Sequence, residues 1–239
     1  MQRRFILGSA VVLLITLTGC PPTPIALKTV VLSPSPGVVF SYREHDSNSG
    51  PCFNVPTYGT GPEVVPPGQI AVGWEDMFVP GAQPFPCNYQ QQMLYRGHVQ
   101  FDLRRFDSIA DATLTYAAFQ SENQTAGPRE NPPQGYATVL GMATGQADYG
   151  NGPMWWPYDN DVALPPCRGN SFTPCSVDVS YQSNQWTQQN HFNYGFIMAG
   201  PKLDYDSGLP QDNNAQLTWY GNFQLTVLYN PALNPRAPQ

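Results

Sequence analysis

The residues best suited to bind a ligand stand together in a segment rich in Gly, Pro, Asn and Asp, residues 145–175. Three aromatic side chains there are followed by acidic and amide side chains: Trp155, Trp156, Tyr158, Asp159 and Asn160. A sugar ring has C–H bonds on one face and hydroxyl groups at its rim, so a flat aromatic surface beside carboxylates and amides suits it. The sequence therefore predicts a ligand-binding surface at these five residues. The alternative is that the two indoles plug the end of a β-sandwich.

Two short acidic turns offer oxygen ligands for a metal ion. Each turn holds two aspartates with one residue between them: Asp159 with Asp161, and Asp204 with Asp206. Ca²⁺ takes about six to eight oxygen ligands in proteins, and closely spaced carboxylates supply some of them. Neither turn completes an EF-hand loop, because the spaced glycine and the terminal glutamate are missing. Calcium is therefore a candidate cofactor, and an acidic turn that binds no metal is the alternative.

The common motifs of hydrolases and nucleotide-binding enzymes are absent from the sequence. It contains no HExxH, no GxSxG and no phosphate-binding Gly-rich loop, and the three histidines, His45, His98 and His191, lie in separate segments. We therefore expect a protein that is not an enzyme. A catalytic triad is recognised by geometry rather than by spacing, so a hydrolase with an unrecognised site stays an alternative.

The N-terminal residues have the order of a secretory signal peptide. Arg3 and Arg4 precede an apolar run from Phe5 to Leu17, and the run ends in the tetrapeptide LTGC, which closes at Cys20. The apolar run is shorter than the about 20 residues that a membrane-spanning helix needs. LTGC resembles the lipobox of bacterial lipoproteins. The resemblance implies that residues 1–19 are removed and that acyl chains such as palmitate anchor Cys20 in the lipid bilayer of the cell envelope. An ordinary leader with a chance cysteine is the alternative.

Four further cysteines predict disulfides in an exported chain: Cys52, Cys87, Cys167 and Cys175. Each directly follows a proline, which predicts positions in loops or at strand ends. Three connectivities are possible, and proximity in the sequence favours Cys52–Cys87 and Cys167–Cys175. A zinc site is the alternative, but no CxxC spacing supports it.

Charge excludes one class of partner. Removal of residues 1–19 takes two of the 11 basic residues and none of the 17 acidic ones, which leaves a formal charge of −8. Such a chain repels phosphate backbones and lacks the basic stripe that nucleic-acid binding requires. The charge favours a neutral glycan, or one bridged by calcium, over nucleic acid.

Alternating apolar and polar residues predict β-strands along most of the chain. The clearest case is two strands between Arg96 and Phe119, which place these residues on one face: Val99, Phe101, Leu103, Ala112, Leu114, Tyr116 and Ala118. Further strands are expected at residues 38–42, 70–74, 136–142, 177–181, 194–198, 216–220 and 222–229. Residues 27–32 form either a first strand or part of a proline-rich spacer. The 26 prolines and 21 glycines are typical of a loop-rich all-β protein.

Two motifs carry a family resemblance. HVQFDL at residues 98–103 is followed by SIADATLTYAAF at 108–119, and a later segment contributes Asp178, Val179, Trp186, Asn193 and Gly195. This pattern resembles the DNRLRE-type domain, a jelly-roll relative of carbohydrate-binding modules, over about residues 70 to 230. The resemblance implies an antiparallel jelly-roll-type β-sandwich that binds polysaccharide. It also implies that Asp102 fixes a loop by accepting hydrogen bonds.

These observations predict the following organisation: a signal peptide at 1–19, a lipidated cysteine and Pro-rich spacer at 20–36, an all-β sandwich with long disulfide-tied loops at 37–230, and a flexible tail at 231–239. The predicted function is that of a membrane-anchored extracytoplasmic lipoprotein with a non-catalytic module for polysaccharide. A structural or adhesion lipoprotein of the envelope, which binds protein, is the main alternative.

Overall fold

The computed structural model describes residues 26–35, 38–49, 61–79, 89–123, 135, 137, 139–143, 162–164, 167, 174–200 and 214–238. Several predicted features lie outside this part of the chain, among them the leader, Cys20, Cys52, Cys87 and these residues: Trp155, Trp156, Tyr158, Asp159, Asn160, Asp161, Asp204 and Asp206. Their roles stay predictions. No helix among the described residues has the length and apolar character to span a bilayer.

The described part of the chain is almost entirely β-structure. Its strands and its helix are, in order, β1 (Lys28–Leu32), β2 (Val39–Ser49), β3 (Gly61–Glu63), β4 (Ile70–Val79), β5 (Tyr89–Val99), β6 (Asp111–Asn123), β7 (Val139–Met142), β8 (Val162–Ala163), β9 (Cys175–Asp178), α1 (Ser180–Thr187), β10 (Phe196–Ala199) and β11 (Asn214–Tyr229).

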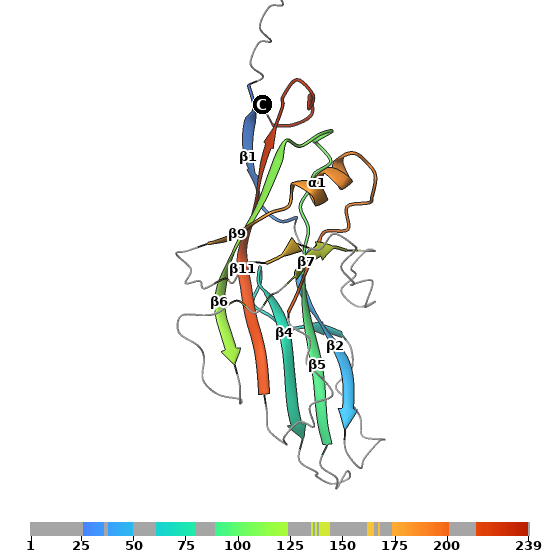
Figure 1. Cartoon of the computed structure of the whole chain (residues 1–239), viewed down its shortest axis with the longest axis vertical. Helices are drawn as coiled ribbons and strands as arrows, with labels where there is room; N and C mark the ends of the chain where they lie inside the picture. The colour runs from blue at the N-terminus through green and yellow to red at the C-terminus, as the bar shows by residue number, and fades with distance from the viewer. Residues whose placement is uncertain are drawn as a thin grey trace, which may run out of the picture.

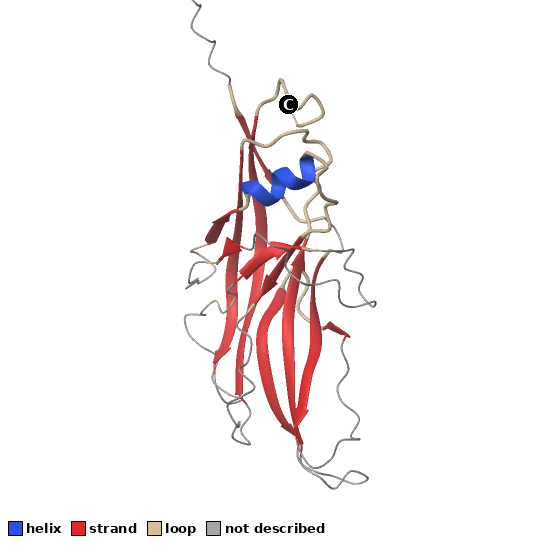
Figure 2. Cartoon of the chain, turned by 45° about the vertical axis from the view of Figure 1, so that its right-hand side comes forward, coloured by secondary structure: helices blue, strands red, loops and turns tan. Residues whose placement is uncertain are grey.

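The strands form two layers that are joined by β4 (Figures 1 and 2). The first layer is β1, β11, β6 and β9, and the second is β3, β2, β5, β10, β7 and β8. Residues 70–76 of β4 pair with β11 and residues 73–79 pair with β5, so the layers are continuous at one end. All these pairings are antiparallel, which confirms the predicted all-β sandwich.

The core lies between the two layers. On β6 the alternate residues Ala112, Leu114, Tyr116 and Ala118 are at most 1% exposed, as the sequence predicts. Side chains of β7, β10 and β11 share this core with them: Leu140, Met142, Phe196, Met198, Leu225 and Val227. Burial of alternate residues along each strand is what fixes the register of the sheet.

The helix α1 departs from the prediction, which placed a strand at residues 177–181. The strand β9 ends at Asp178, whose carboxylate accepts hydrogen bonds from the backbone N–H of Ser180 (2.9 Å) and from its hydroxyl. The Ser180 hydroxyl oxygen also accepts from the Ala112 N–H (2.8 Å), and this contact ends the pairing of β9 with β6. Three of the four buried residues of α1 are polar, which is why hydrophobic periodicity does not reveal it: Gln182, Ser183, Trp186 and Thr187. Trp186 lies in the core, as expected.

The strands β2 and β4 are longer than the apolar pattern predicts. Their pairing with β5 continues to Ser49, opposite Gln90, and to Val79, opposite Tyr89. Backbone hydrogen bonds form a ladder whatever the side chains are, so the polar residues 43–49 extend β2, and residues 75–79, of mixed polarity, extend β4.

The first strand resolves an alternative that the sequence left open. Residues 28–32 form β1, which pairs with β11 from Lys28 opposite Tyr229 to Leu32 opposite Leu225. The chain therefore enters the sheet at Lys28, and the spacer predicted for residues 20–36 ends before that residue.

The disulfide Cys167–Cys175 confirms one of the two predicted pairs. The two Cα atoms lie 5.8 Å apart, and Cys175 is the first residue of β9, directly after Pro174. The bridge closes a short loop onto the first layer.

The C-terminal residues, predicted to be a flexible tail, instead form a turn that packs on the sandwich. Asn234 is fully buried, and its Oδ1 accepts hydrogen bonds from the N–H groups of Asp107 (2.7 Å) and Ser108 (3.0 Å). Its Nδ2 donates to the carbonyl of Asn230 (2.8 Å). Asparagine and proline are common in tails and in tight turns alike, so composition does not distinguish the two.

Replacement of Asn234 tests this turn. Asn234→Ala leaves two backbone N–H groups without their acceptor, so we expect a loss of about 1–3 kcal/mol in the free energy of unfolding. Urea denaturation measures it, and Leu233→Ala is the control, because Leu233 is 59% exposed in the same turn. An Asn234→Ala protein as stable as the wild type would show that the turn is not docked.

Candidate ligand-binding groove

A groove is lined by the segment after β5, the end of β7 and the loop from α1 to β10. Figure 2 shows α1 at one end of the sandwich. Its volume is about 770 Å³, and it is lined by Arg104, Met142, Ala143, Trp186, Gln189, Asn190, His191, Phe192, Asn193 and Tyr194. Most of these side chains are aromatic or carry an amide group. Seven of the ten come from α1 and the loop that follows it, so the position of that loop defines the groove.

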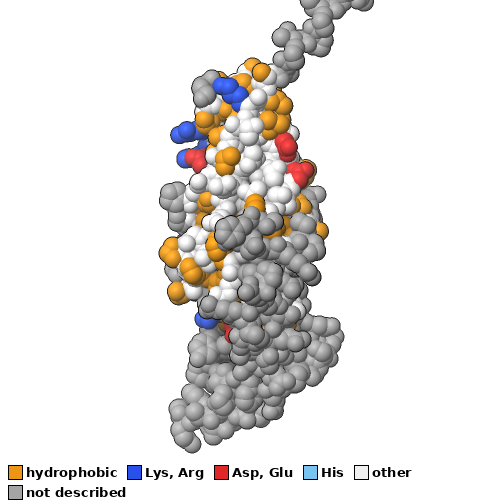
Figure 3. Space-filling model, turned by 90° about the vertical axis from the view of Figure 1, so that its left-hand side faces the viewer, with side chains coloured by type: hydrophobic (Ala, Val, Ile, Leu, Met, Phe, Trp, Pro, Cys, Tyr) orange, Lys and Arg blue, Asp and Glu red, His pale blue; other side chains and the backbone are white. Residues whose placement is uncertain are grey.

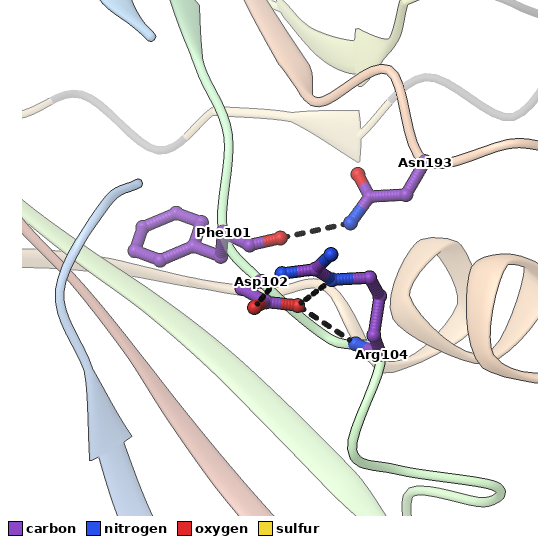
Figure 4. A network of polar contacts seen from close by, with 4 residues as sticks. All are labelled: Phe101, Asp102, Arg104 and Asn193. Carbon is purple, nitrogen blue, oxygen red and sulfur yellow. Dashed lines mark hydrogen bonds and ion pairs between the residues drawn. The ribbon is translucent and has the colours of Figure 1, made fainter. Parts of the chain in front are cut away.

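Hydrogen bonds to the end of β5 hold this loop. The Gln100 side chain donates from Nε2 to the Asn193 carbonyl (2.6 Å), and Asn193 Nδ2 donates to the Phe101 carbonyl (2.8 Å; Figure 4). His98 Nε2 lies 2.6 Å from the Tyr194 carbonyl. We call these three contacts the β5 clasp. They join residues more than 90 positions apart in the chain.

Gly195 explains the Asn-x-Gly pattern at the end of the loop. Its φ is +94°, and a Cβ atom there would lie 2.7 Å from His98 Nε2. Its N–H donates to Asn193 Oδ1 (3.1 Å), and its carbonyl accepts from the Ala143 N–H (2.8 Å). Only a residue without a side chain allows the β5 clasp to close at this point.

Aromatic rings form the floor and one rim of the groove. Trp186, buried at the floor, packs edge-on against Phe196 of the core, with ring centroids 4.7 Å apart. Phe192 is 79% exposed at the rim, and its ring centroid lies 5.9 Å from that of Tyr194. The floor is thus attached to the core, whereas the rim presents an apolar ring to solvent.

Arg104 also lines the groove, and Asp102 holds it in place (Figure 4). Asp102 accepts from Arg104 Nε (2.9 Å), Nη2 (2.7 Å) and the backbone N–H (3.0 Å). The side-chain hydrogen bonds from Arg104 lower the pKa of the Asp102 carboxyl to about 2. Asp102 therefore fixes a loop, as the sequence predicts, and it orients a guanidinium group toward the groove.

His98 is buried behind the loop, against the ring of Phe40. A carbonyl oxygen can only accept, so Nε2 carries the proton that bonds to Tyr194. Burial lowers the pKa of His98 below its ordinary 6.5, although the carbonyls of Tyr194 and Val38 act in the opposite direction.

A separate hollow of about 680 Å³ lies elsewhere on the sandwich and is mostly apolar. It is lined by Pro34, Ser35, Val39, Pro67, Gly68, Gln69, Phe119, Asn222 and Phe223. Phe119 is 36% exposed there, and this hollow shares no lining residue with the groove.

None of the described residues that line the groove belongs to the ligand surface that the sequence predicts, which stays a prediction. The predicted residues at 155–160 lie outside the described part of the chain, and sequence reasoning did not select Gln189, Asn190, Phe192 or Tyr194. The signal that could have found them is the stretch QQNHFNY at 188–194, which joins aromatic and amide residues as the 155–160 segment does. Among the described residues, no group of three or more His, Cys, Asp or Glu side chains could hold a metal ion.

Comparisons of this chain with protein-family models, with curated proteins and with solved structures return no match.

The lowered pKa of His98 predicts a dependence of stability on pH. In the folded chain His98 takes up its second ring proton at a lower pH than it does in the unfolded chain. The free energy of unfolding therefore falls as the pH drops from about 6.5 toward the pKa of folded His98. In urea unfolding at pH 8 to pH 5, His98→Gln, which keeps a donor but cannot titrate, should lose less stability than the wild type. His191→Gln, which removes an exposed histidine of the same loop, is the control for the substitution itself. Identical pH profiles for the wild type and His98→Gln would contradict this assignment.

Proposed function

We propose that this chain is a non-catalytic carbohydrate-binding module held outside the cytoplasm by a lipidated Cys20. The observation that carries the binding part of the proposal is the ring of Phe192, 79% exposed at the rim of a groove lined with aromatic and amide side chains. An apolar ring in solvent gains free energy when a ligand covers it. The ligand must cover this ring and also form hydrogen bonds with the amide side chains around it.

A sugar meets both demands. The rings of Phe192 and Tyr194 are inclined at 46° to each other, so they offer apolar surface to the C–H bonds of one bound unit. Gln189 and Asn190 each have an amide that donates and accepts, and a sugar hydroxyl does the same. Each sugar hydroxyl can therefore either donate a hydrogen bond to one of these amides or accept one from it.

Charge favours a neutral glycan in this groove. The guanidinium of Arg104 is already paired with Asp102, so it acts in the groove as a directed donor rather than as an uncompensated charge. The described side chains on the face in Figure 3 are largely uncharged, in keeping with a chain of only 12% charged residues. An acidic glycan would have to approach a chain of negative net charge.

The proposed anchor places the groove near the membrane. β1 begins at Lys28, eight residues after Cys20, and Lys28 lies opposite Tyr229 in the sheet. The Tyr229 ring packs on Phe106, with centroids 5.3 Å apart, and Phe106 follows Arg104 by two residues. β1 begins at the same end of the sandwich as α1 (Figure 1). Eight residues span at most about 29 Å, so the proposed module would bind glycan close to the lipid surface.

Binding assays with the full chain in detergent test the proposed function. Pull-down on insoluble cellulose, chitin, xylan and mannan, together with a soluble glycan array, should identify at least one polysaccharide. Phe192→Ala should weaken its binding about tenfold, the loss expected from about 1.4 kcal/mol of ring contact. Phe119→Ala, in the separate hollow, is the control and should bind as the wild type does.

Two outcomes would contradict this assignment of the site. Unchanged affinity in Phe192→Ala, with binding lost in Trp155→Ala and Trp156→Ala, would move the site to the surface predicted from the sequence. Binding to none of the glycans would favour the alternative, an envelope lipoprotein that binds protein.

A further inference from the structure

A smaller hollow of about 360 Å³ adjoins the groove. The two hollows share four lining residues, Arg104, Trp186, Gln189 and Asn193. The two hollows are therefore neighbours, and we call them the larger and the smaller half of the groove; the larger half carries Phe192 and Tyr194. The smaller half must therefore be considered together with any ligand that occupies the larger one.

The far wall of the smaller half comes from the C-terminal turn. It carries Arg236, whose Nη2 donates to Asp107 Oδ1, and the two side chains are 62% and 46% exposed. An arginine side chain has five N–H donors, and this contact uses one of them. Arg236 thus keeps donors for a ligand in the smaller half, which the aromatic rings of Phe192 and Tyr194 do not line.

The position of Arg236 is fixed although the residue lies near the end of the chain. Asn234, two residues earlier, is fully buried and accepts from the N–H groups of Asp107 and Ser108. The same loop therefore holds both the turn and the carboxylate that Arg236 contacts. The backbone that carries Arg236 is therefore already ordered before a ligand binds, which lowers the entropic cost of binding.

We propose that the groove binds at least two consecutive sugar units, one over Phe192 and Tyr194 and the next against Arg236, and that Arg236 makes the module selective for chain length. This inference rests on the proposed carbohydrate-binding function. Once the first unit is bound, the second meets its site as an intramolecular event, so affinity rises with length without a stronger first contact.

The test uses the full chain in detergent and a ladder of one to six units made by partial hydrolysis of the polysaccharide that binds best in pull-down. In NMR titration, the wild type should bind oligosaccharides of two or more sugar units at least about tenfold more tightly than the single sugar. Arg236→Ala should lose this gain and keep the wild-type affinity for the single unit. Arg236→Lys, which keeps a donor and the charge, should lose only part of the gain.

The control is Arg105→Ala, which removes an exposed arginine that lines neither hollow and should leave the length dependence unchanged. A urea midpoint for Arg236→Ala equal to that of the wild type shows that the turn stays folded, as expected for an exposed ion pair. Equal affinity of the wild type for one and for several units would overturn the inference while leaving the proposed function intact. The same holds if Arg236→Ala weakens every member of the ladder alike. Failure of every member to bind would instead remove the proposed function itself.

Discussion

The β5 clasp is the constraint on which the rest of the site depends. Its hydrogen bonds from Gln100 and His98 reach carbonyl groups of the loop after α1, and the bond from Asn193 returns to Phe101. Each such bond contributes only about 0.5–1.5 kcal/mol, but leaving its buried partners unpaired costs more. The loop therefore has one well-satisfied position over the end of β5, and that position forms the groove.

Packing of the groove floor on the core extends this constraint to the whole sandwich. Trp186 contacts Phe196, and Phe196 in turn meets Phe101, with ring centroids 6.3 Å apart. Phe196 also pairs through its backbone with Val99 of β5 and with Met142 of β7. The loop that carries the polar binding groups is thus attached to strands that the hydrophobic core holds in register, an arrangement that keeps a site ordered before its ligand arrives.

Regular alternation in the sequence predicts the layers well but not the polar elements between them. The alternation of residues along β6 predicts which of its side chains point into the core, because every second side chain of a strand is buried. The helix α1 does not, since the side chains that it buries are mostly polar and find their partners through the fold. The C-terminal turn is equally hidden, because the backbone groups that Asn234 satisfies lie 126 and 127 residues away.

The candidate site was predictable in composition and not in location. The sequence indicates that aromatic and amide residues in one loop suit a sugar, and QQNHFNY at 188–194 has that composition. What no local pattern shows is that this loop lies against Phe101 and Arg104, from a part of the chain about 90 residues earlier. Those contacts depend on how β5 and β10 pair, which is a property of the folded chain.

Amide hydrogen exchange at Ala143 tests the central claim most directly, because its N–H bonds to the Gly195 carbonyl and reports whether the loop is held. In Asn193→Ala this amide should exchange at least about tenfold faster than in the wild type, as expected for about 1.4 kcal/mol of lost local stability. The amides of β6 should keep their rates. Unchanged exchange at Ala143 in Asn193→Ala would show that the β5 clasp does not position the loop.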